Sequence, residues 1–193
     1  NDVLGLDFSY SQRFQKDNRP FFVEGRRYLP EFWMFYTNNV GELFGGAKVF
    51  GQTGNHRLGL LEVYDRDEVN HMAGQWYWQP FDRIELENKF SWRHGDASTI
   101  DIEEKPQVND NIMYISEIRR GKMVGGSTVY HRIQGGITRS DTVGTNGWNV
   151  EASYSRFPAN GEFGGFLRGR LLSPGFITID GLLDANEADQ RDV

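Results

Sequence analysis

Arginine and glutamate side chains interleaved with aromatic rings are the groups in this sequence best suited to bind a ligand. They lie in one aromatic-rich stretch, residues 14–45, and comprise Arg19, Glu24, Arg26, Arg27 and Trp33. Guanidinium groups bind carboxylates and phosphates through paired hydrogen bonds, and aromatic rings stack on sugars and cations. The five residues are therefore candidates for binding a sugar or an anionic group. The alternative is that the stretch folds inward and plugs or braces a barrel, with its charges paired to lumen charges.

No other cluster has the spacing that catalysis or metal binding requires. The four histidines are far apart and form no His-x-x-x-His pair. Glu103 and Glu104 are adjacent, so in a strand they would face opposite sides, and they make a poor acid/base pair. The paired glycines are not followed by the Lys-Ser/Thr of a phosphate loop, and no Gly-x-Ser-x-Gly elbow occurs. We therefore expect no enzyme activity, no cofactor and no metal; a two-carboxylate polysaccharide hydrolase is a weaker alternative.

The composition excludes several further classes of protein. The chain has 193 residues, no cysteine and a net charge of −6. Without cysteine there can be no disulfide scaffold, zinc-thiolate site or thiol catalysis. The acidic balance argues against a nucleic-acid partner, which would require a basic face. No apolar run is long enough for a transmembrane helix, and the opening Asn-Asp-Val-Leu lacks the basic start of a signal peptide.

Alternation of apolar and polar residues with a period of two predicts the elements that carry these side chains. It is clearest over residues 4–10, 84–93 and 148–155, and turn sequences such as Thr53-Gly54-Asn55 separate the segments. About nine to eleven strands are expected, with no convincing helix. Weaker strands are expected near residues 112–118, 128–133 and 176–182, and another turn at residues 79–82. The fold class predicted is all-β: an antiparallel up-and-down β-barrel of the outer-membrane type, or part of one. We expect a single unit over residues 1–193, with an inserted segment at 14–45 and a polar tail at 184–193.

A membrane barrel and a soluble barrel or sandwich differ in whether the apolar side chains of the strands point outward or inward. Alternation alone does not decide between them. Three features favour the membrane: strands of about ten residues, aromatic residues near strand ends, and a polar face that mixes both signs of charge. In a membrane barrel the polar face lines the lumen. The predicted lumen-lining residues are Arg83, Glu85, Glu87, Arg93, Glu151, Arg168 and Arg170.

The run Asn18-Arg19-Pro20-Phe21-Phe22-Val23-Glu24-Gly25 resembles the RPFFLEG motif of a bacterial outer-membrane barrel family of unknown function. That family is usually described as a carbohydrate-binding family-nine-like domain followed by a large barrel. Similar runs are Gly45-Gly46-Ala47-Lys48 and Ser173-Pro174-Gly175-Phe176. The chain lacks the sugar-binding-like domain and resembles only the start of the barrel. The resemblance implies an outer-membrane location and no established activity.

The function expected is therefore that of an outer-membrane β-barrel protein, either structural or a passive channel, as a subunit or fragment of a larger assembly. Its expected partners are outer-membrane lipid, other chains of a membrane complex and a glycan, with no nucleic acid. The alternative is a soluble glycan-binding β-sandwich or barrel, secreted or periplasmic. The orientation of the apolar strand faces, for example at Ile84, Phe90, Val150 and Leu167, distinguishes the two.

Overall fold

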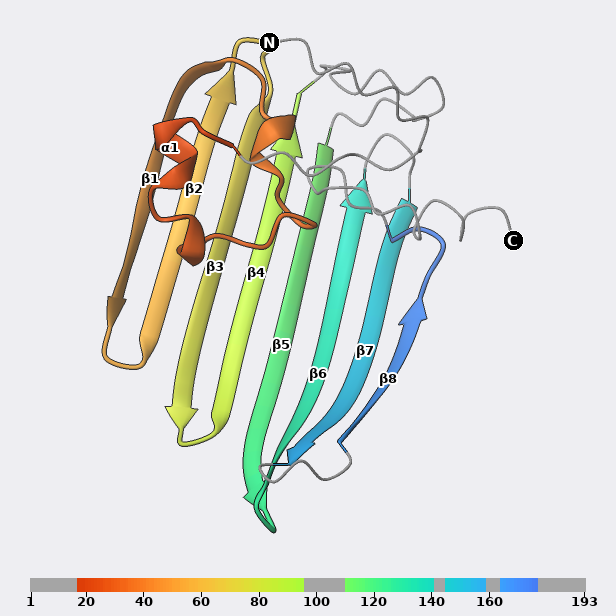
Figure 1. Cartoon of the computed structure of the whole chain (residues 1–193). Coiled ribbons are helices and arrows are strands. Elements are labelled where there is room, and N and C mark those ends of the chain that lie inside the picture. Colours follow the sequence, from red (N-terminus) through yellow and green to blue (C-terminus); the bar gives the residue numbers. More distant parts are fainter. Residues whose placement is uncertain (1–16, 96–109, 141–144, 159–163, 177–193) are drawn as a thin grey trace, which may run out of the picture.

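The computed structural model describes residues 17–95, 110–140, 145–158 and 164–176. These residues form one antiparallel sheet in which eight strands follow each other in chain order (Figure 1). The strands are β1 (Leu43–Thr53), β2 (His56–Asp65), β3 (Asn70–Phe81), β4 (Ile84–His94), β5 (Asp110–Val124), β6 (Ser127–Ser140), β7 (Thr145–Pro158) and β8 (Gly165–Leu172). The all-β, antiparallel, up-and-down architecture predicted from the alternation is confirmed.

The described strands make an open sheet, with β1 and β8 at its two edges. Eight strands lie within the described residues, against an expected nine to eleven. The strand expected over residues 4–10 lies outside the described residues, and so does the polar tail at 184–193. The strand expected near residues 176–182 falls there too, apart from Phe176, which follows a turn.

Two-residue turns join β1 to β2, β3 to β4 and β5 to β6, and each contains a residue with a left-handed backbone. Gly125 and Gly126 both have positive φ and close the β5–β6 hairpin, as a two-residue turn of that hand requires. The Thr53-Gly54-Asn55 turn forms between β1 and β2 as predicted. The next predicted turn, residues 79–82, is displaced: β3 continues to Phe81, and Arg83 takes the positive φ.

Three short helices precede the sheet in a segment that we call the brace, residues 17–42. They are α1 (Pro20–Val23), η1 (Arg26–Tyr28) and η2 (Thr37–Asn39), the last two being 3-10 helices. Figure 1 shows the brace lying across one face of the sheet, over β1 to β4. No helix of the described residues is long and apolar enough to cross a membrane.

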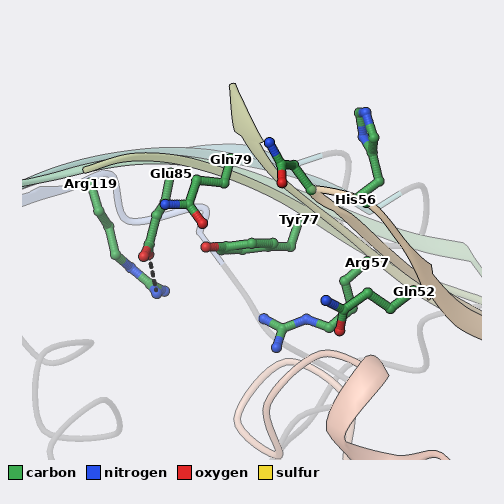
Figure 2. Close-up of a pocket in the computed structure, with 9 residues that line it drawn as sticks. Gln52, His56, Arg57, Tyr77, Gln79, Glu85 and Arg119 are labelled. Carbon is green, nitrogen blue, oxygen red and sulfur yellow. Dashed lines mark ion pairs between the residues drawn. The ribbon is translucent and has the colours of Figure 1, made fainter. Parts of the chain in front are cut away.

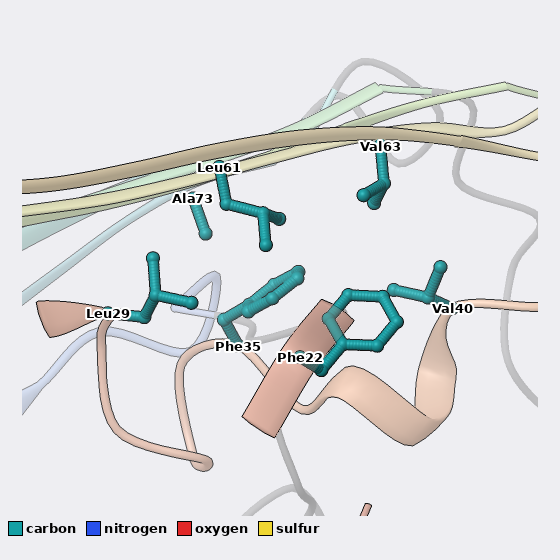
Figure 3. Close-up of a cluster of buried hydrophobic side chains, with 7 residues drawn as sticks. All are labelled: Phe22, Leu29, Phe35, Val40, Leu61, Val63 and Ala73. Atoms are coloured by element: carbon teal, nitrogen blue, oxygen red, sulfur yellow. The ribbon is translucent and has the colours of Figure 1, made fainter. Parts of the chain in front are cut away.

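We call the face that the brace contacts the inner face, and the opposite one the outer face. Apolar side chains of the brace and the inner face form the main core (Figure 3). Phe22, Phe35 and Leu29 from the brace meet Leu61 and Val63 of β2, and all five are buried. Elsewhere the inner face is largely polar, and its buried residues include Gln75, Lys89, Gln134, Asn149 and Glu117.

The outer face is exposed and largely apolar, and it also carries exposed polar residues such as Glu62, Ser116 and Arg120. Its side chains alternate with buried or half-buried ones along β2 to β7, as the pleat of a sheet demands. Ile137 is 61% exposed and Leu167 72% exposed. The other exposed apolar residues of this face include Val49, Leu58, Leu60, Tyr64, Trp76, Ile112, Tyr114, Ile118, Ile133, Trp148, Val150, Tyr154 and Leu171. The face that sequence alone could not orient therefore points away from the brace.

Candidate functional site

A chain of alternating charges crosses the inner face from the brace to β8, and we call it the ion ladder. Its members are Glu31, Lys89, Glu87, Arg119, Glu117, Arg132, Glu151 and Arg168, each paired with the next. They come from the brace, β4, β5, β6, β7 and β8. Strands with side-chain period two place every second residue on one face, so charged residues on neighbouring strands meet there.

The ladder's distances are those of direct ion pairs. Lys89 Nζ lies 2.6 Å from Glu31 Oε1 and 3.2 Å from Glu87 Oε2. On the other side of Glu87, Arg119 Nη2 lies 2.5 Å from the same Oε2. Arg119 also pairs with Glu117, whose second oxygen lies 2.6 Å from Arg132 Nη2. Each buried carboxylate thus has a cationic neighbour, as its removal from water requires.

The last rungs lie on β6, β7 and β8. Arg132 Nη1 lies 3.4 Å from Glu151 Oε1, and Arg168 contacts the other oxygen of Glu151. Glu87, Glu117 and Glu151 are all nearly inaccessible to solvent, whereas their arginine partners remain partly exposed. The charges of the ion ladder therefore neutralise one another on the inner face.

The residues predicted to line a lumen lie on or beside this face, with one difference in position. Glu87 and Glu151 belong to the ladder, and Glu85 lies 3.6 Å from Arg119. Arg93 is buried on β4 with the same parity. Arg168 binds Glu151, while Arg170 is exposed and opposes Glu151 in the strand register. Arg83 lies in the β3–β4 turn rather than in a strand, because β3 continues to Phe81 and β4 begins at Ile84.

Arg19 is used to build the brace. Its guanidinium group binds both carboxylate oxygens of Asp17 and donates to the carbonyl oxygens of Thr37, Val40 and Gly41. It also lies 4.3 Å above the ring of Phe22. Burial alone would raise the pKa of Asp17, but the hydrogen bonds from Arg19 outweigh it and hold that pKa below its usual value. Arg19 therefore joins the two ends of the brace.

The other residues predicted to bind a ligand also make contacts within the brace or with the nearest strands. Arg26 donates to the carbonyl oxygens of Pro30 and Phe35, and burial lowers its pKa despite the nearby Glu31 and Asp17. Arg27 bonds to the hydroxyl of Tyr28.

Glu24 and Trp33 contact different partners. Glu24 Oε2 lies 3.1 Å from Lys48 Nζ, and Trp33 packs on the core cluster around Met113 and Ile115. The three arginines therefore contact groups of the brace, whereas Glu24 and Trp33 contact the sheet.

A polar hollow of about 450 Å³ lies on the inner face beside the turns at the β1–β2 and β3–β4 ends (Figure 2). Gln52, Arg57, Tyr77, Gln79, Glu85 and Arg119 project into it, whereas His56 points to the outer face. The guanidinium of Arg57 lies 4.6 Å from the centre of the Tyr77 ring. A second hollow, of about 540 Å³, shares Gln79, Glu85 and Arg119 and extends towards Tyr130.

Several of these residues were not selected from the sequence. Arg57, Tyr77, Glu117, Arg119 and Arg132 were missed, because none is part of a motif. The alternation of residues could have identified two of them. Glu117 and Arg119 are both odd-numbered, like the buried Met113 and Ile115, so the strand predicted at 112–118, if extended by one residue at each end, places all four on one face. What sequence could not supply was the register that brings Arg132 opposite Arg119.

Neither a protein-family model, nor a curated protein, nor a solved structure matches this chain. Among the described residues, no group of three histidine or acidic side chains is placed to hold a metal ion.

Proposed function

We propose that this chain forms part of the wall of an outer-membrane β-barrel, with no catalytic role, whose outer face meets lipid and whose inner face lines a polar path. The observation that carries the proposal is the exposed apolar outer face, opposite an inner face of paired charges. In a soluble barrel or sandwich the apolar face would be the interior one. Here the brace lies on the inner face (Figure 1), which is apolar beneath the brace and largely polar elsewhere, and the outer face carries exposed apolar side chains.

Strand length and aromatic placement support the same proposal. β1 to β7 have 10 to 15 residues each, and about 9–11 tilted residues are needed to cross the hydrocarbon of a bilayer. At one end of the outer face, His56, Trp76 and Trp78 stack with ring centroids 5.6–6.1 Å apart. Towards the other end lie the ring pairs Phe44–Tyr64 and Trp92–His94. Aromatic rings at both ends of an aliphatic band match the girdles of membrane barrels.

The ion ladder and the brace suggest a passive role for the lumen side. Charges that neutralise each other leave a wettable surface without a strong net field, as a structural wall or a weakly selective path requires. In a closed barrel, the free edges of β1 and β8 would pair with further strands, from this chain or from others, because an exposed edge is open to pairing. The resemblance of the Arg19–Gly25 run to an outer-membrane family agrees with this proposal.

The experiment is flotation of the purified protein with phospholipid vesicles. The wild-type chain should require detergent for solubility and should float with the vesicles. Ile133→Glu adds a charge on the outer face, and Ser153→Glu adds the same charge on the inner face opposite Arg168. A charge on the lipid face costs up to a few kcal/mol near the midplane, about 2–4 for a basic residue and less for an acid. Ile133→Glu should therefore reduce flotation more than Ser153→Glu.

A wild-type chain that stays soluble and monomeric without detergent, and that binds no lipid, would reject the proposal. Saturable binding to a glycan array by such a soluble protein, lost in Trp33→Ala, would instead favour a glycan-binding module.

A further inference from the structure

Arg57 differs from the cations of the ion ladder in its surroundings. Within the described residues, no carboxylate forms an ion pair with it, whereas Lys89, Arg119, Arg132 and Arg168 all have acidic partners. The Nε atom of Arg57 is buried and has no hydrogen-bond partner, as is also the case for Arg132 Nε, so the missing carboxylate partner is what distinguishes Arg57 in the described part of the chain. A buried donor without a hydrogen-bond partner lowers stability by about 1–3 kcal/mol. A ligand group that accepts a hydrogen bond from Arg57 Nε would remove this destabilisation, and that gain would favour binding.

The position of the Arg57 side chain is fixed by its aromatic neighbour. The guanidinium group lies over the ring of Tyr77, 4.6 Å from its centre, and both project into the polar hollow (Figure 2). Stacking occupies the face of the guanidinium and leaves its edge, where the N–H donors lie, available to a partner. A planar edge of N–H donors matches a carboxylate, which accepts two parallel hydrogen bonds.

The remaining walls of the hollow indicate what surrounds the carboxylate. Gln52 and Gln79 contribute neutral amides, which can donate to and accept from hydroxyl groups. Glu85 is the acidic group of the hollow, and it is already engaged by Arg119 at 3.6 Å and by the hydroxyl of Tyr77. The volume of about 450 Å³ lies in the range of small-molecule sites.

We propose that this hollow is a binding site for a small hydroxylated carboxylate, of the class of acidic sugars, with Arg57 as the residue that reads the carboxylate. Gln52 and Gln79 contact the hydroxyl groups, and the Glu85–Arg119 pair closes the far side. The site is formed by residues of β1 to β5 and of the β1–β2 turn, and its carboxylate-binding residue lies on the inner face, so its occupancy does not depend on lipid contact.

Calorimetric titration of the purified full chain with galacturonate and with galactose tests the proposal, because the two sugars differ only in the C6 carboxylate. Galacturonate should bind saturably, and galactose at least about ten-fold more weakly, as the loss of a charged hydrogen-bonded pair implies. Arg57→Gln should weaken galacturonate binding about ten- to hundred-fold. Arg66→Gln, which removes an exposed arginine paired with Glu42 beyond the opposite end of β2, should leave it unchanged.

Gln52→Ala provides a second variant, since Gln52 is exposed and its removal leaves the Arg57–Tyr77 stack in place. It should weaken galacturonate binding about two- to ten-fold with an unchanged circular dichroism spectrum. The proposal is overturned by the absence of saturable galacturonate binding up to about 50 mM, by equal binding of galactose, or by an Arg57→Gln protein that is folded and binds as the wild type does.

Discussion

Phe35 is the side chain whose removal should most directly release the brace from the sheet. It is fully buried and packs with Phe22 of the brace and with Leu61 and Val63 of β2. Figure 3 shows the ring between the sheet and the backbone of the brace. Truncation of a buried phenylalanine to alanine costs about 3–5 kcal/mol. The strand side of this site is held by cross-strand hydrogen bonds and cannot collapse into the cavity, so the upper part of that range is expected.

The strands of the sheet are held by hydrogen bonds to one another, so Phe35→Ala should lower the free energy needed to open the brace and leave the sheet intact. At 1.36 kcal/mol for each factor of ten, the upper part of that range raises the open population about a thousand-fold to several-thousand-fold. Tryptic cleavage after Arg26 or Arg27 measures that population, because both bonds lie in η1 and require local opening. Phe32→Ala removes the same ring from an exposed position of the brace and should change the cleavage rate less than ten-fold.

A Phe35→Ala protein that is cleaved at the wild-type rate would refute this reasoning. So would equal acceleration in Phe32→Ala, because the brace would then not be held by its buried core.

Three further predictions concern the brace and the ion ladder. Gly59→Ala would place a Cβ 2.0 Å from the carbonyl oxygen of Tyr28, so η1 must shift and tryptic cleavage should accelerate; Gly135→Ala, with nothing within 4 Å, should not have this effect. Glu117→Ala removes the carboxylate that Arg119 and Arg132 share, but Arg119 keeps Glu87 and Arg132 keeps Glu151, so the free energy of unfolding in urea should fall by about 1–3 kcal/mol; an unchanged free energy would contradict the ladder's structural role. Lowering the pH should release the brace. Hydrogen bonds and charge from Lys89 outweigh burial and hold the pKa of Glu31 below its usual 4.5, and Arg19 does the same for Asp17. At acidic pH the released brace therefore binds more protons than the packed brace. The stabilisation is complete above the usual pKa values of the two carboxyl groups and is lost as the pH falls through their lowered values. Hydrogen exchange of the brace amides should thus show less protection at about pH 3 than at pH 6, beyond the intrinsic pH effect; equal protection factors would contradict it.

The alternation of residues predicted the class of fold but not its orientation. Segments such as 84–93 and 148–155 became strands because every second residue is apolar, and that pattern is local. Which face is covered depends on where a distant segment packs. Phe22 and Phe35 lie about 25 to 50 residues before the β2 and β3 side chains that they bury against, and no local signal encodes that pairing.

The candidate site, like the fold, was predictable from local sequence only in part. Glu85, Glu87 and Glu151 could be selected because each alternates with apolar neighbours. Their partners Arg119 and Arg132 could not be matched to them, because a shift of one residue in register moves every side chain to the other face. Arg19 and Arg26 were ambiguous for a further reason. A guanidinium that binds a ligand and one that caps carbonyl oxygens have the same sequence surroundings, and only the contacts of Arg19 with Thr37 and Val40 distinguish them.

The orientation of β7 in a bilayer tests the central proposal most directly. The chain has no cysteine, so single cysteines at Ala152 and Ser153 give unambiguous spin-label sites on opposite faces of one strand. In phospholipid vesicles, power saturation should show the label at position 152 more accessible to oxygen than to a water-soluble nickel chelate. The label at position 153 should show the reverse. A label at position 152 that the nickel chelate relaxes as strongly as it relaxes the label at 153 would contradict a lipid-facing outer surface.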